Sequence, residues 1–199
     1  MTPESRREIW LERVLLPFNV KHLSGPRRVP YGQDELIVVC LLRNAEPYVA
    51  GFIEHYLRLG AKHIVFLDNG STDGTVDLAS RHPQVSVLRT TLSFRDNNCA
   101  MRRYLLRRFG KSAHWALCVD VDELFDYPYS DRIGLGALLR YLRSRSFSAM
   151  AAYMLDMMSG EPLSRAPSPG TSLRRSYPFY DISDVRKLGY FEEDPYHGE

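Results

Sequence analysis

The central part of the chain alternates between short, continuous apolar runs and longer segments with helical periodicity. Apolar runs at residues 36–42, 63–67, 85–88 and 115–119 have the length of strands, and their continuity is typical of strands buried on both faces. Between the first two runs, apolar residues recur at helical spacing from Pro47, which can open a helix, to Gly60, which can end one. Similar patterns predict a short helix up to about residue 80, helices at 97–109 and 135–142, and a further strand at 147–155.

This alternation predicts an α/β fold with a mainly parallel sheet flanked by helices. Ligands of such sheets bind beyond the carboxyl ends of the strands. We therefore expect the loops after Leu42, Leu67 and Val119 to share one crevice.

The two ends of the chain differ from this centre. Residues 3–18 can form an amphipathic helix with Ile9, Trp10, Val14 and Leu15 on one face, which suits docking on the domain or contact with a membrane surface or a partner. Residues 24–34 are predicted as a loop, and residues 159–181, rich in Pro, Ser, Gly and Arg, as a long mobile loop. The predicted organisation is therefore an N-terminal helix and loop (1–34), a core (35–158) and a C-terminal region that begins with the mobile loop (159–199).

Composition narrows the function classes. The chain is 44% hydrophobic and 25% charged with a net charge of +2, which is ordinary for a globular protein and gives no case for a nucleic-acid partner. Cys40, Cys99 and Cys118 lack metal-ligand spacing and suggest free thiols in a reducing compartment. Since no signal region or membrane-length apolar stretch is present, we expect a cytoplasmic protein, with peripheral contact at the inner face of a membrane left open.

The strongest chemical signal is the run of acids in Cys118-Val119-Asp120-Val121-Asp122-Glu123-Leu124. If the strand continues, Asp120 and Asp122 point to the same side, and two neighbouring carboxylates repel each other unless a cation lies between them. Hard oxygen ligands of this kind suit Mg²⁺ or Mn²⁺. A solvated acidic turn is the alternative.

Two other loops carry polar residues at predicted carboxyl ends. Asp68 ends the second strand and opens the turn Asp68-Asn69-Gly70-Ser71-Thr72-Asp73-Gly74-Thr75, where a carboxylate could accept from the N–H of a nucleotide base. The loop after the first strand offers Arg43, Asn44 and Glu46 to the same predicted crevice. Plain helix-capping turns remain the alternative in both places.

Together these motifs resemble glycosyltransferase family 2, and especially its small bacterial branch with an Asp-Asn-x-Ser-Thr-Asp turn and an Asp-Val-Asp-Glu tip. The resemblance covers Arg43-Asn44-Ala45-Glu46, residues 54–60, Asp68 to Thr75, and Trp115 to Phe125. It implies a GT-A fold, a Rossmann-like sheet that binds a nucleoside-diphosphate sugar, and Mn²⁺ or Mg²⁺ as cofactor. On this resemblance, residues 35–158 are the nucleotide-sugar-binding core, and residues 159–199 contain a mobile loop and a partial acceptor region.

The resemblance also implies roles for single residues. Asp122 matches the direct metal ligand, Asp120 lies nearer the ribose and diphosphate and can share the metal, and Asp68 falls at the base-binding turn. Arg95, just before the predicted start of a helix at Asn97, is our candidate for the diphosphate, whereas Arg102, Arg107 and Arg108 are interpreted as a solvated basic face.

An inverting transferase also needs a general base for the acceptor hydroxyl. The segment Leu188 to Glu193 loosely resembles one that precedes the base in the family, which would place the base near Glu199; His197 is a weaker candidate for a late metal ligand. The predicted activity is sugar transfer from a nucleoside-diphosphate sugar to a carbohydrate, lipid or protein acceptor that the sequence does not identify. A non-catalytic or truncated nucleotide-sugar-binding module, and a nucleotidyltransferase, are the alternatives.

Overall fold

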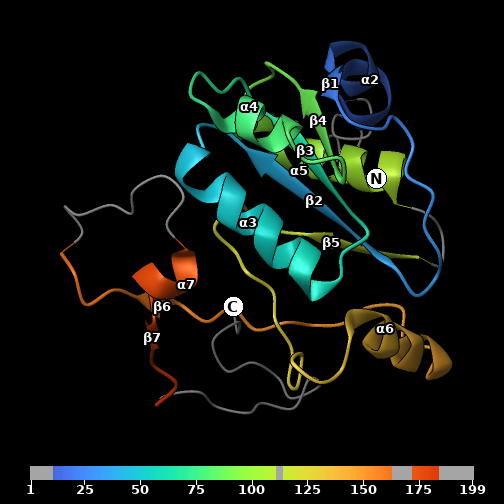
Figure 1. Cartoon of the computed structure of the whole chain (residues 1–199). Coiled ribbons are helices and arrows are strands. Elements are labelled where there is room, and N and C mark those ends of the chain that lie inside the picture. Colours follow the sequence, from blue (N-terminus) through green and yellow to red (C-terminus); the bar gives the residue numbers. More distant parts are fainter. Residues whose placement is uncertain (1–10, 111–113, 163–171, 184–199) are drawn as a thin grey trace, which may run out of the picture.

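The computed structural model describes residues 11–110, 114–162 and 172–183, and it centres on one five-stranded sheet (Figure 1). The strand order is β1-β4-β3-β2-β5, in which β2, β3, β4 and β5 are parallel and β1 pairs antiparallel with β4 at one edge. The bounds are β1 (Lys21–Ser24), β2 (Leu36–Leu42), β3 (His63–Asp68), β4 (Val85–Arg89) and β5 (Trp115–Cys118). The predicted mainly parallel α/β sheet is confirmed.

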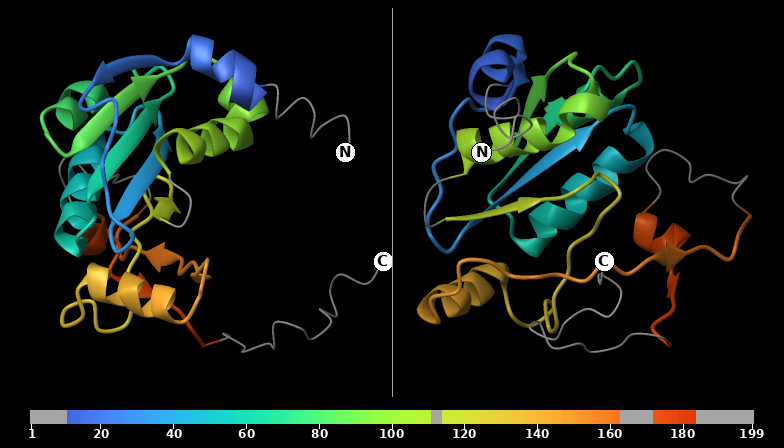
Figure 2. Two further views of the ribbon diagram at one scale, coloured as in Figure 1. Left: turned by 90° about the vertical axis from the view of Figure 1, so that its right-hand side faces the viewer. Right: turned by 180° about the vertical axis from the view of Figure 1, so that it is seen from behind.

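Helices cover both faces of this sheet (Figures 1 and 2). One face carries α3 (Glu46–Leu59) and α4 (Thr75–Ser80), and the other carries α5 (Phe94–Phe109), the π-helix η1 (Leu11–Leu15) and α2 (Leu16–Asn19). A further helix, α6 (Leu135–Ser144), packs Leu135 and Leu139 against the core on the α3 side. Within the described residues, no helix combines the length and the apolar character that a membrane crossing requires.

Strand β2 separates two hydrophobic cores because its side chains alternate between the faces of the sheet. Leu36, Val38, Cys40 and Leu42 point toward α3 and α6, and Ile37, Val39 and Leu41 point toward α5. All seven residues of β2 are buried, which explains the continuous apolar run in the sequence. Truncating a large side chain in such a core, for example Phe52→Ala, removes about 3–5 kcal/mol of stability.

The predicted strand at 147–155 is wrong. Residues 147–156 have no regular secondary structure, and large apolar side chains such as Tyr153 and Met154 are exposed. A strand needs a neighbour for its N–H and C=O groups, and among the described residues after α6 strand pairing occurs only between β6 (Met157–Met158) and β7 (Phe179–Tyr180). The long loop predicted at 159–181 is also partly wrong, because β7 and the short helix α7 (Leu173–Ser176) lie in its described part.

Smaller differences concern element ends. Strand β1 was not predicted, since its four residues alternate only between exposed and half-buried positions. Helix α5 begins at Phe94 rather than Asn97, so Arg95 lies in its first turn and not before it. The described part of the predicted N-terminal helix, from Leu11 onward, is helical as far as Asn19.

Candidate functional site

The carboxyl ends of β3, β2 and β5 lie side by side at one edge of the sheet. Strand β2 is central, paired in parallel with β3 through Leu42 opposite Asp68 and with β5 through Val39 opposite Cys118. The three loops that follow these strands therefore leave the sheet at the same edge, while the shared crevice predicted for them stays a prediction. They are the polar loop 43–46, the turn 68–75 and the acidic turn 120–123.

The loops after β2 and β3 are tied together by hydrogen bonds. The backbone N–H of Asn44 donates to Ser71 Oγ at 2.8 Å, and Asn44 Oδ1 accepts from the N–H of Thr72 at 2.9 Å. Glu46 Oε2 accepts from the N–H of Gly74 at 2.9 Å. Thus the side chains of Asn44 and Glu46, both predicted to bind nucleotide, hold the neighbouring turn in place.

The start of α4 continues this network. The N–H of Ala45 donates to Thr75 Oγ1 at 2.7 Å, and Thr75 donates in turn to Asp73 Oδ1 at 2.6 Å. Burial alone would raise the pKa of Asp73, but hydrogen bonds from the hydroxyl and amide of Thr75 outweigh it and lower that pKa. A Cβ at position 74 would meet Glu46 Oε1 at 2.8 Å, so any residue larger than Gly74 would displace the Glu46 carboxylate.

Asp68 lies at the end of β3 with its side chain fully buried. Its carboxylate accepts from the N–H groups of Gly70 and Ser71, and from Arg89 Nε at 2.6 Å. The parallel register aligns Asp68 with Arg89 on β4, which explains the ion pair. To bind a base, as predicted, the Asp68 carboxylate would first have to become accessible, because its side chain is 0% exposed.

The acidic turn does not continue β5, so the predicted alternation of Asp120 and Asp122 along a strand is wrong. The strand ends at Cys118, and the N–H of Glu123 donates to the carbonyl oxygen of Asp120 at 3.1 Å. Glu123 Oε2 accepts from the N–H of Asp120 at 2.8 Å and closes the turn from the other side. The turn is thereby closed by bonds at both of its ends, and the Asp122 side chain is left exposed.

Asp120 is paired with Arg102 of α5. The distance from Arg102 Nη2 to Asp120 Oδ1 is 2.6 Å, and the two side chains are 30% and 45% exposed. Burial favours the neutral guanidine, but hydrogen bonds to Cys118 and Asp120 outweigh it and raise the pKa of Arg102. The interpretation of Arg102 as part of a solvated basic face is therefore wrong.

Helix α3 fixes the segment that follows the acidic turn. Tyr56, fully buried, donates from its hydroxyl to the carbonyl oxygen of Glu123 at 2.9 Å and accepts from the N–H of Phe125 at 3.0 Å. His55 Nε2 lies 2.8 Å from the carbonyl oxygen of Phe125. Burial raises the pKa of Tyr56 to about 12, so the hydroxyl stays protonated, and burial lowers the pKa of His55.

Among the other predicted site residues, Arg43 and Arg95 are exposed on the loop after β2 and on the first turn of α5. Glu199, the predicted base, and His197 lie outside the described residues.

The acids of the turn have the chemistry of ligands for the predicted cation. Asp120 and Asp122 supply hard carboxylate oxygens that are open to solvent, and Mg²⁺ or Mn²⁺ held by one or two carboxylates plus phosphates and water needs no more from the protein. Within the described ranges, no cluster of three or more His, Cys, Asp or Glu side chains is placed to hold a metal by itself. The donor set therefore suits a cation shared with a phosphate-bearing ligand rather than a closed structural site.

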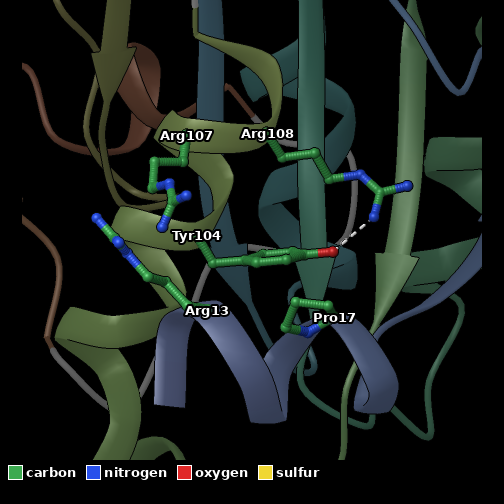
Figure 3. A pocket seen from close by; sticks show the side chains of 5 residues that line it. All are labelled: Arg13, Pro17, Tyr104, Arg107 and Arg108. Carbon is green, nitrogen blue, oxygen red and sulfur yellow. Dashed lines mark hydrogen bonds between the residues drawn. The ribbon is translucent and has the colours of Figure 1, made fainter. Parts of the chain in front are cut away.

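A separate pocket of about 190 Å³ lies between the N-terminal helices and α5 (Figure 3). It is lined by Arg13, Pro17, Tyr104, Arg107 and Arg108. Arg108 Nη1 donates to the Tyr104 hydroxyl at 2.6 Å across it. None of the predicted site residues lines this pocket.

Sequence reasoning missed four side chains that support the site: His55, Tyr56, Arg89 and Arg102. A signal existed for Arg89, because β3 and β4 are both apolar runs that end in residues of opposite charge. His55 and Tyr56 lie in residues 54–60, a stretch that carried the family resemblance without an assigned role. Arg102 had no local signal, since its partner lies 18 residues away on another element.

Comparison with known proteins adds one positive finding. A search of curated proteins gave no significant match. Residues 36–127, which begin with β2 and run through the acidic turn to Tyr127, match the family model described as glycosyl transferase family 2, and this match supports that family for the chain.

Proposed function

We propose that this chain binds a nucleoside-diphosphate sugar with a divalent cation at the edge formed by the carboxyl ends of β3, β2 and β5, as the donor-binding part of a glycosyltransferase. The observation that carries the proposal is the position of the acidic turn. It lies within the family match near its C-terminal end, follows the strand next to β2, and presents the carboxylates of Asp120 and Asp122 to solvent.

The chemistry follows from the charge that develops on the leaving group. As the glycosidic bond breaks, the nucleoside diphosphate gains negative charge, and Mn²⁺ or Mg²⁺, when bound, stabilises that charge as a Lewis acid. Asp122 would bind the cation directly. Asp120 would lie near the ribose and share the cation with Asp122. Arg43 and Arg95 are exposed at the same edge and would contribute positive charge toward the diphosphate.

The role of the other polar residues is to position the loops. Asn44 and Glu46 hold the turn 68–75, and Tyr56 holds the segment after the acidic turn. Because these groups are already hydrogen-bonded, the edge is organised before a donor arrives, which reduces the ordering cost of binding.

Calorimetry with uridine or guanosine diphosphate, with and without Mn²⁺, tests the proposal. We expect binding that depends on Mn²⁺ and that Asp122→Ala removes, because loss of a phosphate-bridging cation costs on the order of several kcal/mol. Asp131→Ala is the matched control, since Asp131 is an exposed acid outside the turn, 74% exposed. Equal binding with and without Mn²⁺, or an unaffected Asp122→Ala, would contradict the metal role.

A second candidate, a module that binds donor with little turnover, is favoured by the region after the acidic turn. Among the described residues after Glu123, only Leu135, Leu139 and Leu142 are buried. An acceptor site needs a packed wall and a base within hydrogen-bond reach of the acceptor hydroxyl. We therefore expect these 199 residues to bind a donor better than they transfer its sugar.

The two candidates separate in an assay of this chain, and of any longer natural form, against a panel of nucleotide sugars. Slow or absent transfer by the 199-residue chain, with robust transfer by a longer form or after addition of a partner subunit, would support the binding module. Robust transfer by this chain alone that survives Glu199→Gln would show that the base lies elsewhere and that the acceptor site is complete.

A further inference from the structure

The two Asp–Arg pairs at the carboxyl edge of the sheet differ in how easily each ion pair can open and its aspartate can take another partner. In the pair Asp68–Arg89, the aspartate is fully buried and is also fixed by two backbone N–H groups. In the pair Asp120–Arg102, both side chains are partly exposed, at 45% and 30%. The second pair can therefore open to water or to a ligand without exposing a buried charge.

Arg102 is the positively charged partner of Asp120. Its Nη2 lies 2.6 Å from Asp120 Oδ1, and within the described residues its other hydrogen bond is the weak one from Nη1 to Cys118 Sγ at 3.7 Å. The guanidinium is thus bound mainly to one carboxylate oxygen. Any second cation that uses this oxygen must displace Arg102 or share the carboxylate with it.

We propose that Arg102 is an internal counter-ion that competes with the divalent cation for Asp120 and moves to the diphosphate when the nucleotide binds. This inference rests on the proposed function of the acidic turn and adds regulation to it. With no nucleotide, two cations compete for one carboxylate, so Arg102 weakens metal binding. With a diphosphate present, the added negative charge accommodates both cations, and the forked guanidinium can pair with phosphate oxygens.

The consequence is positive coupling between metal and nucleotide. Each ligand raises the affinity of the other by the same factor, because coupling free energies are reciprocal. Arg102 increases that factor in two ways. It weakens metal binding when no nucleotide is present, and it strengthens nucleotide binding when the metal is present. The acidic turn would therefore hold little metal until a donor is present.

Titration of Mn²⁺ followed by electron paramagnetic resonance, alone and with saturating uridine or guanosine diphosphate, tests the inference on the full chain. For Arg102→Gln we expect Mn²⁺ alone to bind about two- to fivefold more tightly, which corresponds to the removal of a partly exposed ion pair. We expect the diphosphate to bind about tenfold or more weakly in the presence of Mn²⁺, as for the loss of one charge-assisted hydrogen bond. Arg102→Lys, which keeps the charge, should lie between this variant and the wild type.

Opposite signs of the two effects separate this role from a structural one. If Arg102 only supported the fold, Arg102→Gln would weaken both ligands and lower the melting temperature, and that result would overturn the inference. Arg103→Gln removes the same charge one residue along α5, and Arg103 is exposed. An equal gain in Mn²⁺ affinity in this control would reduce the effect to net charge and overturn the inference too.

The titrations also distinguish failure of the inference from failure of the proposed function. If the wild type shows no Mn²⁺-dependent nucleotide binding, the proposed function fails, while the Mn²⁺-only comparison still tests competition at Asp120. If the wild type binds both ligands cooperatively and Arg102→Gln leaves Mn²⁺ affinity unchanged, the function stands and the inference is wrong.

Discussion

Two acid-bearing turns leave the same edge of the sheet, yet their polar groups are arranged in opposite ways. In the turn 68–75, Asp68 is buried and ion-paired with Arg89, and Asp73 accepts a hydrogen bond from Thr75. The loop after β2 adds further hydrogen bonds to this turn. In the turn 120–123, Glu123 closes the turn through backbone groups, Asp122 is exposed, and Asp120 is partly exposed and paired with the partly exposed Arg102. Acidic residues that look equivalent in the sequence thus divide into a group that holds the fold and a group that is available to a ligand.

The difference between the two turns is tested most directly by removing one acid from each. Asp68→Ala leaves Arg89 and two backbone N–H groups without their acceptor, so we expect a loss of about 3 kcal/mol of stability, the lower range for a broken buried pair, because Arg89 is 35% exposed. Asp122→Ala should change stability by less than about 0.5 kcal/mol, as for an exposed position. Urea denaturation of the two variants measures both, and similar losses would mean that the turns do not differ.

The amino end of β3 gives a second test, through pH. His63 is buried with Nε2 2.8 Å from Ser86 Oγ, and burial lowers its pKa from 6.5 to about 4. The unfolded chain therefore takes up a proton near pH 6.5, whereas the folded chain takes it up only near pH 4. His63 therefore costs no stability above pH 6.5, and the free energy of unfolding falls between pH 6.5 and 4, by at most about 3 kcal/mol.

The variant His63→Gln isolates this contribution, because its amide can still donate to Ser86 but does not titrate. Urea denaturation at several pH values between about 4.5 and 7.5, which lie around the pKa values of the folded and unfolded chain, should show a smaller loss of stability toward acid pH for the variant than for the wild type. Parallel curves would show that His63 does not carry the acid sensitivity in this pH range.

The strands of this fold were predictable because burial on both faces leaves a continuous apolar run. That signal found β2 to β5 with small errors at their ends. The same signal failed at 147–155, where apolar content exists without a pairing neighbour among the described residues. Strand β1 gave no signal, because its residues are at best half-buried and its pairing with β4 is a tertiary contact.

The site was predictable as a set of positions but not as a set of contacts. A residue at the end of an apolar run is visible in the sequence, so Asp68 and the acidic turn were found. Whether such a carboxylate is buried depends on the register between strands and on helix α5, which bring Arg89 to Asp68 and Arg102 to Asp120. Those distances are set by packing, and local sequence patterns do not encode them.

A third test addresses the support beneath the acidic turn. Tyr56→Phe removes the hydroxyl that joins the carbonyl oxygen of Glu123 to the N–H of Phe125 and leaves both groups without that partner. We expect a loss of about 2 kcal/mol of stability, within the range for buried unsatisfied groups. We also expect weaker Mn²⁺-dependent nucleotide binding, because the segment after the acidic turn is no longer held in place and the carboxylates of the turn become less well positioned. Nucleotide affinity unchanged despite the loss of stability would show that the turn is positioned without Tyr56.

The smallest effect concerns the loop that ties β2 to the turn 68–75. Asn44 has a positive φ of 50°, which asparagine tolerates better than most residues, and its Oδ1 accepts from the N–H of Thr72 at 2.9 Å. Asn44→Gly removes the side-chain bond but relieves the backbone, whereas Asn44→Ala removes the bond and keeps a Cβ at positive φ. We expect losses of about 1 kcal/mol for glycine and about 2 kcal/mol for alanine, since a left-handed conformation costs roughly 1–2 kcal/mol for a residue with a Cβ. Thermal denaturation of the pair, with Arg43→Ala as an exposed neighbour that should change little, measures the difference. Equal losses for glycine and alanine would assign the whole effect to the hydrogen bond with Thr72, and a larger loss for glycine would show that the flexibility of the unfolded chain outweighs the strain at this position.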